Sequence, residues 1–480
     1  MKKYNSLSEI QILIAQKKLD LPDLLAYYFT QIEKHQNLNA FNEVFFNSAK
    51  TQALLVQEKI NNGTAGRLAG MVIGIKDNIL YKDHISTASS KMLESFISPY
   101  SSTVAERLIA EDAIIIGRLN CDEFAMGGSN ETSYYGPVRN AADPERVAGG
   151  SSGGSAVAVQ ADLCLSALGT DTGGSVRQPA AFCGCYGLKP TYGRISRYGV
   201  IAYASSFDQV GTLTSSVSDA ALLLEVLAGA DEHDSTVSRL PVPSYLNKLD
   251  DSQPKKIAVI REMLESEVLD PDTKTVILEA IEAFKAQGHT VDYVSFDLLD
   301  YLVPAYYVLT AAEASSNLSR YDGVHFGYRN LEAKNLNSLY KKSRAEGFGE
   351  EVKRRILLGT FVLSAGYYDA YYQKAQQVRR LLRDKIDALF VDYDVLLTPV
   401  APTPAFKIGE NIQDPLVMYM ADIFTVLPSL TGVPAIAIPL GNNSAGLPLS
   451  MQLMTRHFEE GALLALSNNF TLDLSAQADH

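Results

Sequence analysis

The chain has 480 residues, 46% of them hydrophobic, and a formal net charge of −13. Such an acidic chain repels phosphate backbones, which argues against direct nucleic-acid binding as the main activity but leaves room for a complex in which another protein holds RNA. The N-terminus has no apolar signal region and no apolar run reaches about 18 residues, so we expect a soluble cytoplasmic protein that does not span a membrane.

The first sixty residues have the pattern of helices. Ser6-Leu7-Ser8-Glu9 has the spacing of a capping box in front of an apolar-periodic stretch. No Pro-rich tract, Gly/Ser repeat or run of like charge interrupts the rest of the chain. We therefore expect a helical segment over residues 1–60 that packs on the core, and a single large domain over residues 61–480.

Strand and helix patterns then alternate along the chain. Short apolar runs predict buried strands, whereas apolar residues at helical spacing predict helices between them. This alternation predicts an α/β fold with a central mixed or largely parallel β-sheet covered by helices on both faces. The predicted strands are 71–75, 113–116, the second half of 156–168, 256–260, 290–296, 394–398 and 435–439, and the predicted helices are 103–111, the first half of 156–168, 272–286, 350–390 and 459–472.

The four cysteines, Cys121, Cys164, Cys183 and Cys185, contain no CxxC pair. The spacing of the last two could belong to a metal or redox pair, but small buried residues are the favoured interpretation. Cys164 lies in an apolar run and is expected to be a buried free thiol.

Two glycine- and serine-rich segments stand out. Residues 149–155 read GGSSGGS and run directly into an apolar stretch, which argues against a flexible linker. Residues 169–177 read GTDTGGSVR and follow a predicted strand. A Gly-Gly turn there would point consecutive N–H groups one way and present Ser175 at the start of a helix. Such a nest suits an oxyanion or a phosphate, but the absence of a GxxxxGK[ST] motif excludes a P-loop.

A serine nucleophile needs a base, and the histidines of this chain are poorly placed for that role. His84 is the nearest candidate, but it follows a charged turn and is expected to be solvated. Lys76 closes the apolar run 71–75, so it either reaches water at the end of a strand or is buried there, where burial would favour the neutral amine. The histidines are His35, His84, His233, His289, His325, His457 and His480.

Together, Lys76 and the two glycine-serine segments closely resemble the amidase-signature family. That family has a lysine after a hydrophobic strand, then GGSSGGS and GTDxGGSxR, with the spacings of 75 and 24 residues that separate Lys76, Ser151 and Ser175 here. The resemblance implies a Ser-cis-Ser-Lys triad in which Ser175 attacks an amide carbon, Ser151 relays the proton and neutral Lys76 is the base. It also implies an oxyanion hole made by the N–H groups of Thr172, Gly173, Gly174 and Ser175, with Ser152, Asp171 and Arg177 in support.

Further stretches resemble one branch of that family, the A subunits of the glutamyl-tRNA(Gln) and aspartyl-tRNA(Asn) amidotransferases. They are residues 121–131, 205–211, 312–317, 351–360 and 419–422, and the resemblance covers nearly the whole chain. It implies a glutamine-hydrolysing amidotransferase subunit of the carbon–nitrogen ligase class, which supplies ammonia for the ATP-dependent amidation of Glu-tRNA(Gln) or Asp-tRNA(Asn). A tRNA-binding B subunit with kinase and transamidase activity and a small C subunit would complete a heterotrimer. ATP and magnesium would be used by the B subunit, with no cofactor or metal in this chain.

By the same resemblance, Arg355 binds the carboxylate of glutamine and Asp422 binds its ammonium. An arginine fork suits a carboxylate. Taken alone, Arg355 beside Lys353 and Arg354 would be a charge on a solvated helix face, whereas Asp422 lies in an apolar context and needs a cation in any case. The remaining residues that the resemblance places in the substrate site are Met126, Gly127, Gly128, Ser129 and Tyr306.

Two other functions stay open. A free-standing amidase acting on small or aryl amides would share the triad but lack recognition by Arg355 and Asp422. A binding or scaffold protein with an inactive site is the other, and the intact Lys76, Ser151 and Ser175 argue against it.

Overall fold

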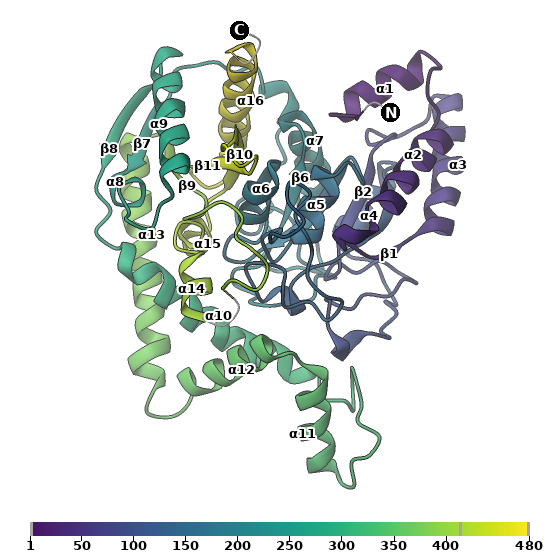
Figure 1. Cartoon of the computed structure of the whole chain (residues 1–480), viewed down its shortest axis with the longest axis vertical. Helices are drawn as coiled ribbons and strands as arrows, with labels where there is room; N and C mark the ends of the chain where they lie inside the picture. The colour runs from purple at the N-terminus through teal and green to yellow at the C-terminus, as the bar shows by residue number, and fades with distance from the viewer. Residues whose placement is uncertain (1–2, 412–414, 478–480) are drawn as a thin grey trace.

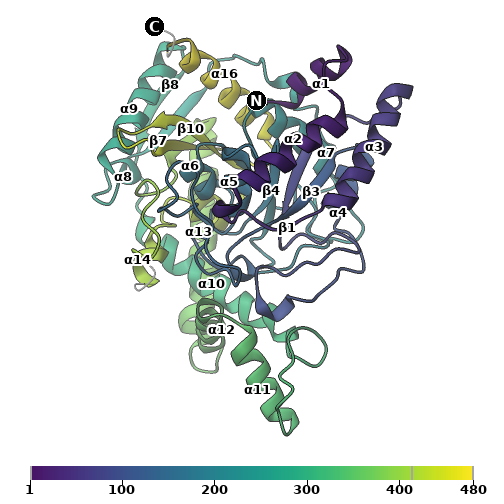
Figure 2. The same cartoon turned by 45° about the vertical axis from the view of Figure 1, so that its right-hand side comes forward.

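The computed structural model describes residues 3–411 and 415–477, and an eleven-stranded β-sheet forms its centre (Figure 1). Its strand order is β1-β3-β2-β4-β6-β5-β10-β11-β9-β7-β8. Helices flank the sheet (Figure 2). The strands are β1 (Phe41–Val44), β2 (Val72–Lys76), β3 (Ile114–Leu119), β4 (Ser166–Asp171), β5 (Tyr186–Lys189), β6 (Gln209–Thr214), β7 (Lys256–Ile260), β8 (Thr290–Val294), β9 (Val395–Pro399), β10 (Ala435–Asn442) and β11 (Pro448–Thr455).

The sheet is mixed rather than largely parallel. β2 is parallel to β3 and β4, and β7 is parallel to β8 and β9. The strands in the middle of the sheet, from β4 through β6, β5, β10 and β11 to β9, pair antiparallel. The predicted α/β fold with a mixed sheet is thus confirmed. The largely parallel alternative is wrong, because it omitted the antiparallel strands β5, β6 and β11.

The N-terminal segment is not wholly helical. Helices α1 (Leu7–Ala15), α2 (Leu21–Lys34) and α3 (Phe46–Asn62) form, and the Ser6 hydroxyl caps α1 by accepting the Glu9 N–H at 3.3 Å. Strand β1, however, lies between α2 and α3 and pairs antiparallel with β3. The prediction of helix throughout residues 1–60 is wrong at this strand, because pairing with a strand that is distant in the sequence decides its conformation.

Helices α10 (Leu302–Asn317), α11 (Leu336–Gly347) and α12 (Glu350–Val362) form an extension below the sheet, from which α11 projects (Figure 1). The single long helix predicted over 350–390 is interrupted: α12 ends, Gly366 adopts a φ of 89°, and a π-helical turn at Tyr368–Gln373 leads into α13 (Lys374–Asp392).

The other helices follow the alternation of the strands. The periodicity predicted four of them, at 103–111, in the first half of 156–168, at 272–286 and at 459–472, and the glycine-serine turn predicted a fifth after Ser175, whereas the other four were not predicted. The bounds of these helices are α4 (Thr103–Ala110), α5 (Gly153–Gln160), α6 (Arg177–Cys183), α7 (Val217–Leu227), α8 (Arg261–Leu264), α9 (Pro271–Ala286), α14 (Pro415–Met420), α15 (Val426–Thr431) and α16 (Glu460–Gln477), with short 3-10 turns at Gln36–Leu38, Lys91–Leu93, Glu123–Ala125, Leu246–Lys248, Leu299–Tyr301 and Leu318–Arg320. Within the described ranges, no helix has the length and apolarity needed to cross a bilayer.

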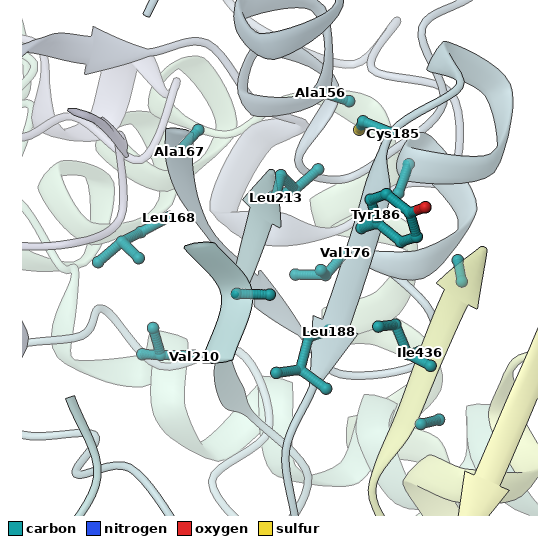
Figure 3. Close-up of a cluster of buried hydrophobic side chains, with 14 of the residues drawn as sticks. Ala156, Ala167, Leu168, Val176, Cys185, Tyr186, Leu188, Val210, Leu213 and Ile436 are labelled. Carbon is teal, nitrogen blue, oxygen red and sulfur yellow. The ribbon is translucent and has the colours of Figure 1, made fainter. Parts of the chain in front are cut away.

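One hydrophobic cluster extends from Leu7 in α1 to Phe470 in α16. Near the glycine-serine segments it packs side chains of β4, β5, β6 and β10 against α5 (Figure 3). Removal of this apolar surface from water holds the helices on the sheet. All four cysteines are buried free thiols, as expected for Cys164 and favoured for Cys183 and Cys185. The labelled members of the cluster are Ala156, Ala167, Leu168, Val176, Cys185, Tyr186, Leu188, Val210, Leu213 and Ile436.

Candidate active site

The predicted base, Lys76, is the last residue of β2 and is fully buried. Its Nζ donates hydrogen bonds to Ser151 Oγ at 2.7 Å and to Ser152 Oγ at 2.9 Å. The alternative in which this lysine ends a strand and reaches water is therefore wrong. The amine is held beside both serines of the first glycine-serine segment.

Burial also changes the acidity of Lys76. Loss of hydration disfavours the ammonium form and lowers the pKa of Lys76 to about 8, although Cys121 and the buried carboxyl groups of Asp122 and Asp171 oppose the shift. An ordinary lysine, with a pKa of about 10.4, is almost wholly protonated at neutral pH. Lys76 has a larger neutral fraction there, which suits a base.

The serines of the first segment lie at the N-terminus of α5. The peptide bond Gly150–Ser151 is cis, as the family resemblance implied. Ser151 and Ser152 are both fully buried. Ser152 N–H donates to Ser175 O at 3.1 Å, and this backbone hydrogen bond joins the two glycine-serine segments. The structure therefore brings Lys76, Ser151 and Ser175 into one site.

Ser175 lies in the turn between β4 and α6. It keeps 8% of its surface exposed, whereas Lys76 and Ser151 are fully buried. Ser175 is thus the one of the three that solvent can reach, which is the position that a nucleophile facing a substrate would take.

The backbone of this turn differs in one respect from the expected oxyanion hole. Gly174 N–H donates to Asp171 Oδ1 at 2.9 Å, so it is already occupied. The N–H groups of Thr172, Gly173 and Ser175 make no hydrogen bond within the described chain and remain available to an oxyanion. The sequence could not reveal this, because the Asp171 carboxylate bonds to Gly174 only once the turn is closed.

Two glycines let other side chains approach the turn closely. A β-carbon on Gly173 would collide with the Tyr306 hydroxyl, and a β-carbon on Gly174, whose φ is 131°, would collide with Thr425. Thr425 Oγ1 donates to Gly173 O at 2.6 Å. Tyr306, predicted to lie near the substrate, therefore packs directly against the turn that carries Ser175.

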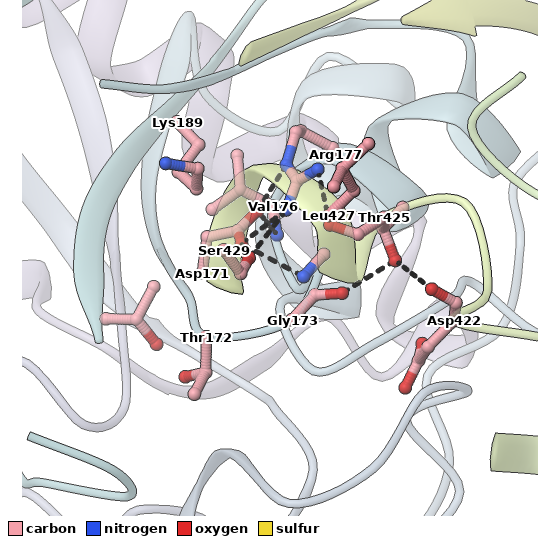
Figure 4. A network of polar contacts seen from close by, with 12 residues as sticks. Asp171, Thr172, Gly173, Val176, Arg177, Lys189, Asp422, Thr425, Leu427 and Ser429 are labelled. Carbon is pink, nitrogen blue, oxygen red and sulfur yellow. Dashed lines mark hydrogen bonds and ion pairs between the residues drawn. The ribbon is translucent and has the colours of Figure 1, made fainter. Parts of the chain in front are cut away.

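A buried ion pair supports the turn (Figure 4). Arg177 and Asp171 are both fully buried and are joined by two hydrogen bonds, from Nη2 to Oδ1 at 2.8 Å and from Nε to Oδ2 at 3.0 Å. Arg177 also donates to Thr425 O and to the side chains of Gln452 and Ser429. Burial alone would raise the pKa of Asp171, but Arg177 holds this pKa below its usual range. The two charges satisfy each other inside the protein.

A cavity of about 230 Å³ is lined by most of the predicted substrate-binding residues, and none of residues 169–177 lines it. Gly128, in its wall, is tied to α6 because its carbonyl accepts a hydrogen bond from Gln178 Nε2 at 2.8 Å. Four of the predicted substrate-binding residues line the cavity, namely Gly127, Gly128, Ser129 and Arg355, together with Glu123, Glu131, Thr132, Tyr307, Gly349, Glu350, Glu351, Arg354, Met418 and Tyr419.

Met126, Tyr306 and Asp422 do not line this cavity. Met126 is fully buried and presents its carbonyl to the Thr132 hydroxyl. Asp422 lies next to the cavity wall, because its Oδ2 accepts the hydroxyl of Tyr307 at 2.7 Å. The structure thus brings most of the predicted substrate site together and places Met126 behind it.

Arg355 is buried, with only 4% of its surface exposed. The expectation of a charge on a solvated helix face, drawn from its neighbours Lys353 and Arg354, is wrong because this side of α12 faces α10 and the cavity. Its Nε donates to Glu351 Oε1 at 2.7 Å and its Nη1 to Tyr203 OH at 2.7 Å. Burial opposes its charge, but Tyr203 and Glu351 keep the pKa of Arg355 above its usual range.

Asp422 has no cation beside it within the described chain, so the expected ion pair is absent. Its partner is the hydroxyl of Tyr307, and burial raises the pKa of Asp422 to about 7. A half-buried carboxyl group with one neutral donor is poorly compensated. A ligand cation would complete its environment.

The structure does not place His84 in this site. His84 is half-buried rather than solvated, stacks on Tyr81, and its Nε2 lies 3.0 Å from Ser48 Oγ. His480 lies outside the described residues. Lys76 is therefore the one predicted base that the fold brings to the serines.

The sequence interpretation missed Glu351, Tyr203, Tyr307 and Tyr419, which surround Arg355. A signal was present for Glu351, because it precedes Arg355 by four residues on one helix, the spacing of a helical ion pair. The tyrosines come from three separate segments, and no local pattern marks them.

Comparison with known proteins bears on the whole chain. Residues 23–464 match the family described as Amidase. The chain is 51% identical to the A subunit of the Glutamyl-tRNA(Gln) amidotransferase from Chlorobium luteolum, over 92% of each chain, and 47% identical to the protein of the same name from Koribacter versatilis, over 95% and 96%. The crystal structure of the corresponding A subunit from Thermotoga maritima superposes with a TM-score of 0.79 at 40% identity, over 93% of this chain and 91% of that one.

Proposed function

Because this chain belongs to the amidase family, we propose that it hydrolyses the side-chain amide of glutamine through Ser175, Ser151 and Lys76 and supplies the ammonia to a tRNA-dependent amidotransferase. The observation that carries the proposal is the contact between Lys76 Nζ and Ser151 Oγ, 2.7 Å apart and fully buried. The names and close similarity of the relatives support the choice of glutamine.

The first step is acylation. Ser175 Oγ attacks the amide carbon of glutamine while its proton passes to Ser151 Oγ, and the Ser151 proton passes to neutral Lys76 Nζ. The negative charge that develops on the amide oxygen is stabilised by the N–H groups of Thr172, Gly173 and Ser175. The proton returns from Lys76 through Ser151 to the leaving nitrogen, ammonia departs, and a glutamyl ester remains on Ser175.

The second step is deacylation. A water molecule attacks the ester carbon and gives its proton to the same relay. The tetrahedral intermediate expels Ser175 Oγ, which regains a proton, and glutamate leaves. Arg177 and Asp171 hold the turn without taking part in proton transfer, because their charges pair with each other.

Glutamine binds in the cavity by both of its charged groups. Arg355 takes the carboxylate, because its Nη2 is directed to no partner within the described chain, and a guanidinium can offer two parallel N–H donors. Asp422 takes the ammonium, since it lacks a cation. Tyr306 packs against the turn that carries Ser175, and Gly128 lines the cavity.

The ammonia is used by a partner in a cytoplasmic heterotrimer. A B subunit binds tRNA and activates the tRNA-bound glutamate or aspartate with ATP and magnesium, and a small C subunit completes the complex. The acidic net charge of −13 is consistent with tRNA being held by the B subunit.

The test is glutamate release from glutamine, by the chain alone and by the chain co-expressed with candidate B and C subunits. Release should rise when partner subunits and charged tRNA are present and should disappear in Ser175→Ala. Ser235→Ala, at an exposed serine in a turn, is the matched control and should keep full activity.

Two outcomes would redirect the proposal. Hydrolysis of an apolar aryl amide that depends on Ser175, without hydrolysis of glutamine under any condition, would identify a free-standing amidase. Failure of a fluorophosphonate probe to label Ser175 in folded protein would indicate an inactive site and a binding role.

A further inference from the structure

Two opposite charges at the cavity do not pair: Arg355 lines the cavity, and Asp422 lies next to its wall. Arg355 and Asp422 are both within reach of Tyr307: the guanidinium carbon lies 5.2 Å from the ring centroid, and the carboxylate accepts the hydroxyl at 2.7 Å. No ion pair joins Arg355 and Asp422 within the described chain. Arg355 is buried, and attraction between opposite charges is stronger away from bulk water. Something must hold them apart.

Glu351 provides that restraint on Arg355. It lies one turn earlier on α12, and its Oε1 accepts Arg355 Nε at 2.7 Å. Its Oε2 accepts a hydrogen bond from Arg354. Only 13% of the Glu351 side chain is exposed, so its attraction for Arg355 is weakly screened by water.

Tyrosines connect Glu351 to the opposite side of the cavity. Tyr419 OH donates to Glu351 Oε1 at 3.1 Å, and its ring stacks on Tyr307 with centroids 4.0 Å apart. Tyr307 in turn donates to Asp422. A continuous set of contacts therefore runs from Arg355 through Glu351, Tyr419 and Tyr307 to Asp422, and fixes the two charges relative to each other.

The fork of Arg355 is left open by these contacts. A guanidinium has five N–H donors. Glu351 takes the one on Nε and Tyr203 takes one on Nη1. The outer edge, formed by Nη1 and Nη2, can still take a carboxylate in the bidentate manner.

We infer that Glu351 is a positioning residue that prevents Arg355 from pairing with Asp422, and thereby makes the cavity selective for an amino acid that carries both a carboxylate and an ammonium. This inference rests on the proposed function, because it specifies how glutamine is recognised. Without Glu351, the buried guanidinium would turn to Asp422, and the two groups that should bind the ligand would neutralise each other.

The test compares three amides in the complex with its partner subunits: glutamine, 4-aminobutanamide, which lacks the carboxylate, and glutaramate, which lacks the ammonium. For Glu351→Ala, kcat/KM for glutamine should fall about 100-fold, mostly through KM, as expected when a binding group is misplaced. Turnover of 4-aminobutanamide should fall less, because this amide loses only its contact with Asp422, and labelling of Ser175 by a fluorophosphonate should stay the same. Glu351→Gln, which keeps an acceptor for Arg355 Nε, and Tyr419→Phe should show smaller losses in the same direction.

Asp384→Asn is the matched control. Asp384 also pairs with an arginine four residues away on a helix, but the pair with Arg380 is exposed on α13. It should leave all three substrates unchanged. An equal loss for glutamine and 4-aminobutanamide in Glu351→Ala, or no loss for glutamine, would overturn the inference.

A double variant tests the separation of charges itself. Glutaramate needs Arg355 but not Asp422, so Glu351→Ala should slow glutaramate hydrolysis. Adding Asp422→Asn should then raise the rate of glutaramate hydrolysis roughly tenfold, because Arg355 is released from Asp422. A double variant no faster than Glu351→Ala would overturn the inference. A wild-type complex that fails to prefer glutamine over 4-aminobutanamide would instead refute the proposed function, so the two failures can be told apart.

Discussion

The two halves of the site are built differently. The catalytic floor, made of Lys76, Ser151, Ser175, Asp171 and Arg177, comes from about 100 consecutive residues and is almost wholly buried. The recognition wall comes from distant segments and surrounds a cavity. We define the wall by Glu351, Arg355, Tyr307, Tyr419 and Asp422.

The catalytic floor and the recognition wall differ in how their charged side chains are paired. In the floor, the Asp171–Arg177 pair is closed and fully hydrogen-bonded, so it needs no ligand. In the wall, Arg355 keeps free donors and Asp422 has a single neutral donor. A closed network supports chemistry that is common to many amides, whereas an open one selects the substrate.

The largest expected effect comes from replacing Lys76, the proposed general base in the catalytic floor. Lys76→Met should lower acylation by at least about 10⁴-fold, the order seen when one member of a catalytic triad is removed. Loss of fluorophosphonate labelling and of glutamate release would measure it. Lys50→Met, at an exposed position of α3, should change neither, and a Lys76→Met enzyme that retains most of its activity would require a different base.

The second effect concerns the support of the floor. Arg177→Met leaves Asp171 as an unpaired buried charge and should lower the free energy of unfolding by about 3–5 kcal/mol. Urea unfolding would measure it. Arg380→Met breaks an exposed pair and should leave the midpoint unchanged. Equal midpoints for the two variants would show that the buried pair is not a structural element.

The third expected effect comes from a substitution in the recognition wall alone. Arg355→Met should lower kcat/KM for glutamine on the order of 100-fold, because a charge-assisted contact to the carboxylate is lost. Hydrolysis of an apolar aryl amide should fall little or not at all. Parallel assays with both substrates would show whether floor and wall act independently, and a similar loss for both would contradict that.

The smallest expected effect is a difference in pH dependence between the hydrolysis of glutamine and that of an apolar amide, and it separates the roles of floor and wall. The pKa of Lys76 is lowered to about 8, and only the neutral amine is a base, so the rate for any amide should fall roughly tenfold per pH unit below that value. The pKa of Asp422 is raised to about 7, and only its carboxylate binds the ammonium. Below pH 7, kcat/KM for glutamine should therefore fall more steeply than that for an apolar amide. Parallel limbs would exclude Asp422 from ammonium binding.

Local sequence could reveal most of the floor. Lys76 at the end of an apolar strand, and serines within glycine-rich turns, have local signatures, because conformation there depends on neighbouring residues. The wall gave weaker signals. Glu351 and Arg355 have helical ion-pair spacing, yet the adjacent Lys353 and Arg354 made the group resemble a solvated face.

The sequence by itself determined the alternation of strands and helices, the positions of the glycine-serine turns and the identity of the chemical groups, since these depend on periodicity and on backbone preferences over a few residues. Only the tertiary structure decided that β1 is a strand, that the sheet is mixed rather than largely parallel, that Lys76 is buried, that Gly174 N–H is taken by Asp171, and that Asp422 faces a tyrosine rather than a cation. Strand pairing and the solvation of a charge both depend on residues that are distant in the chain and become neighbours only on folding.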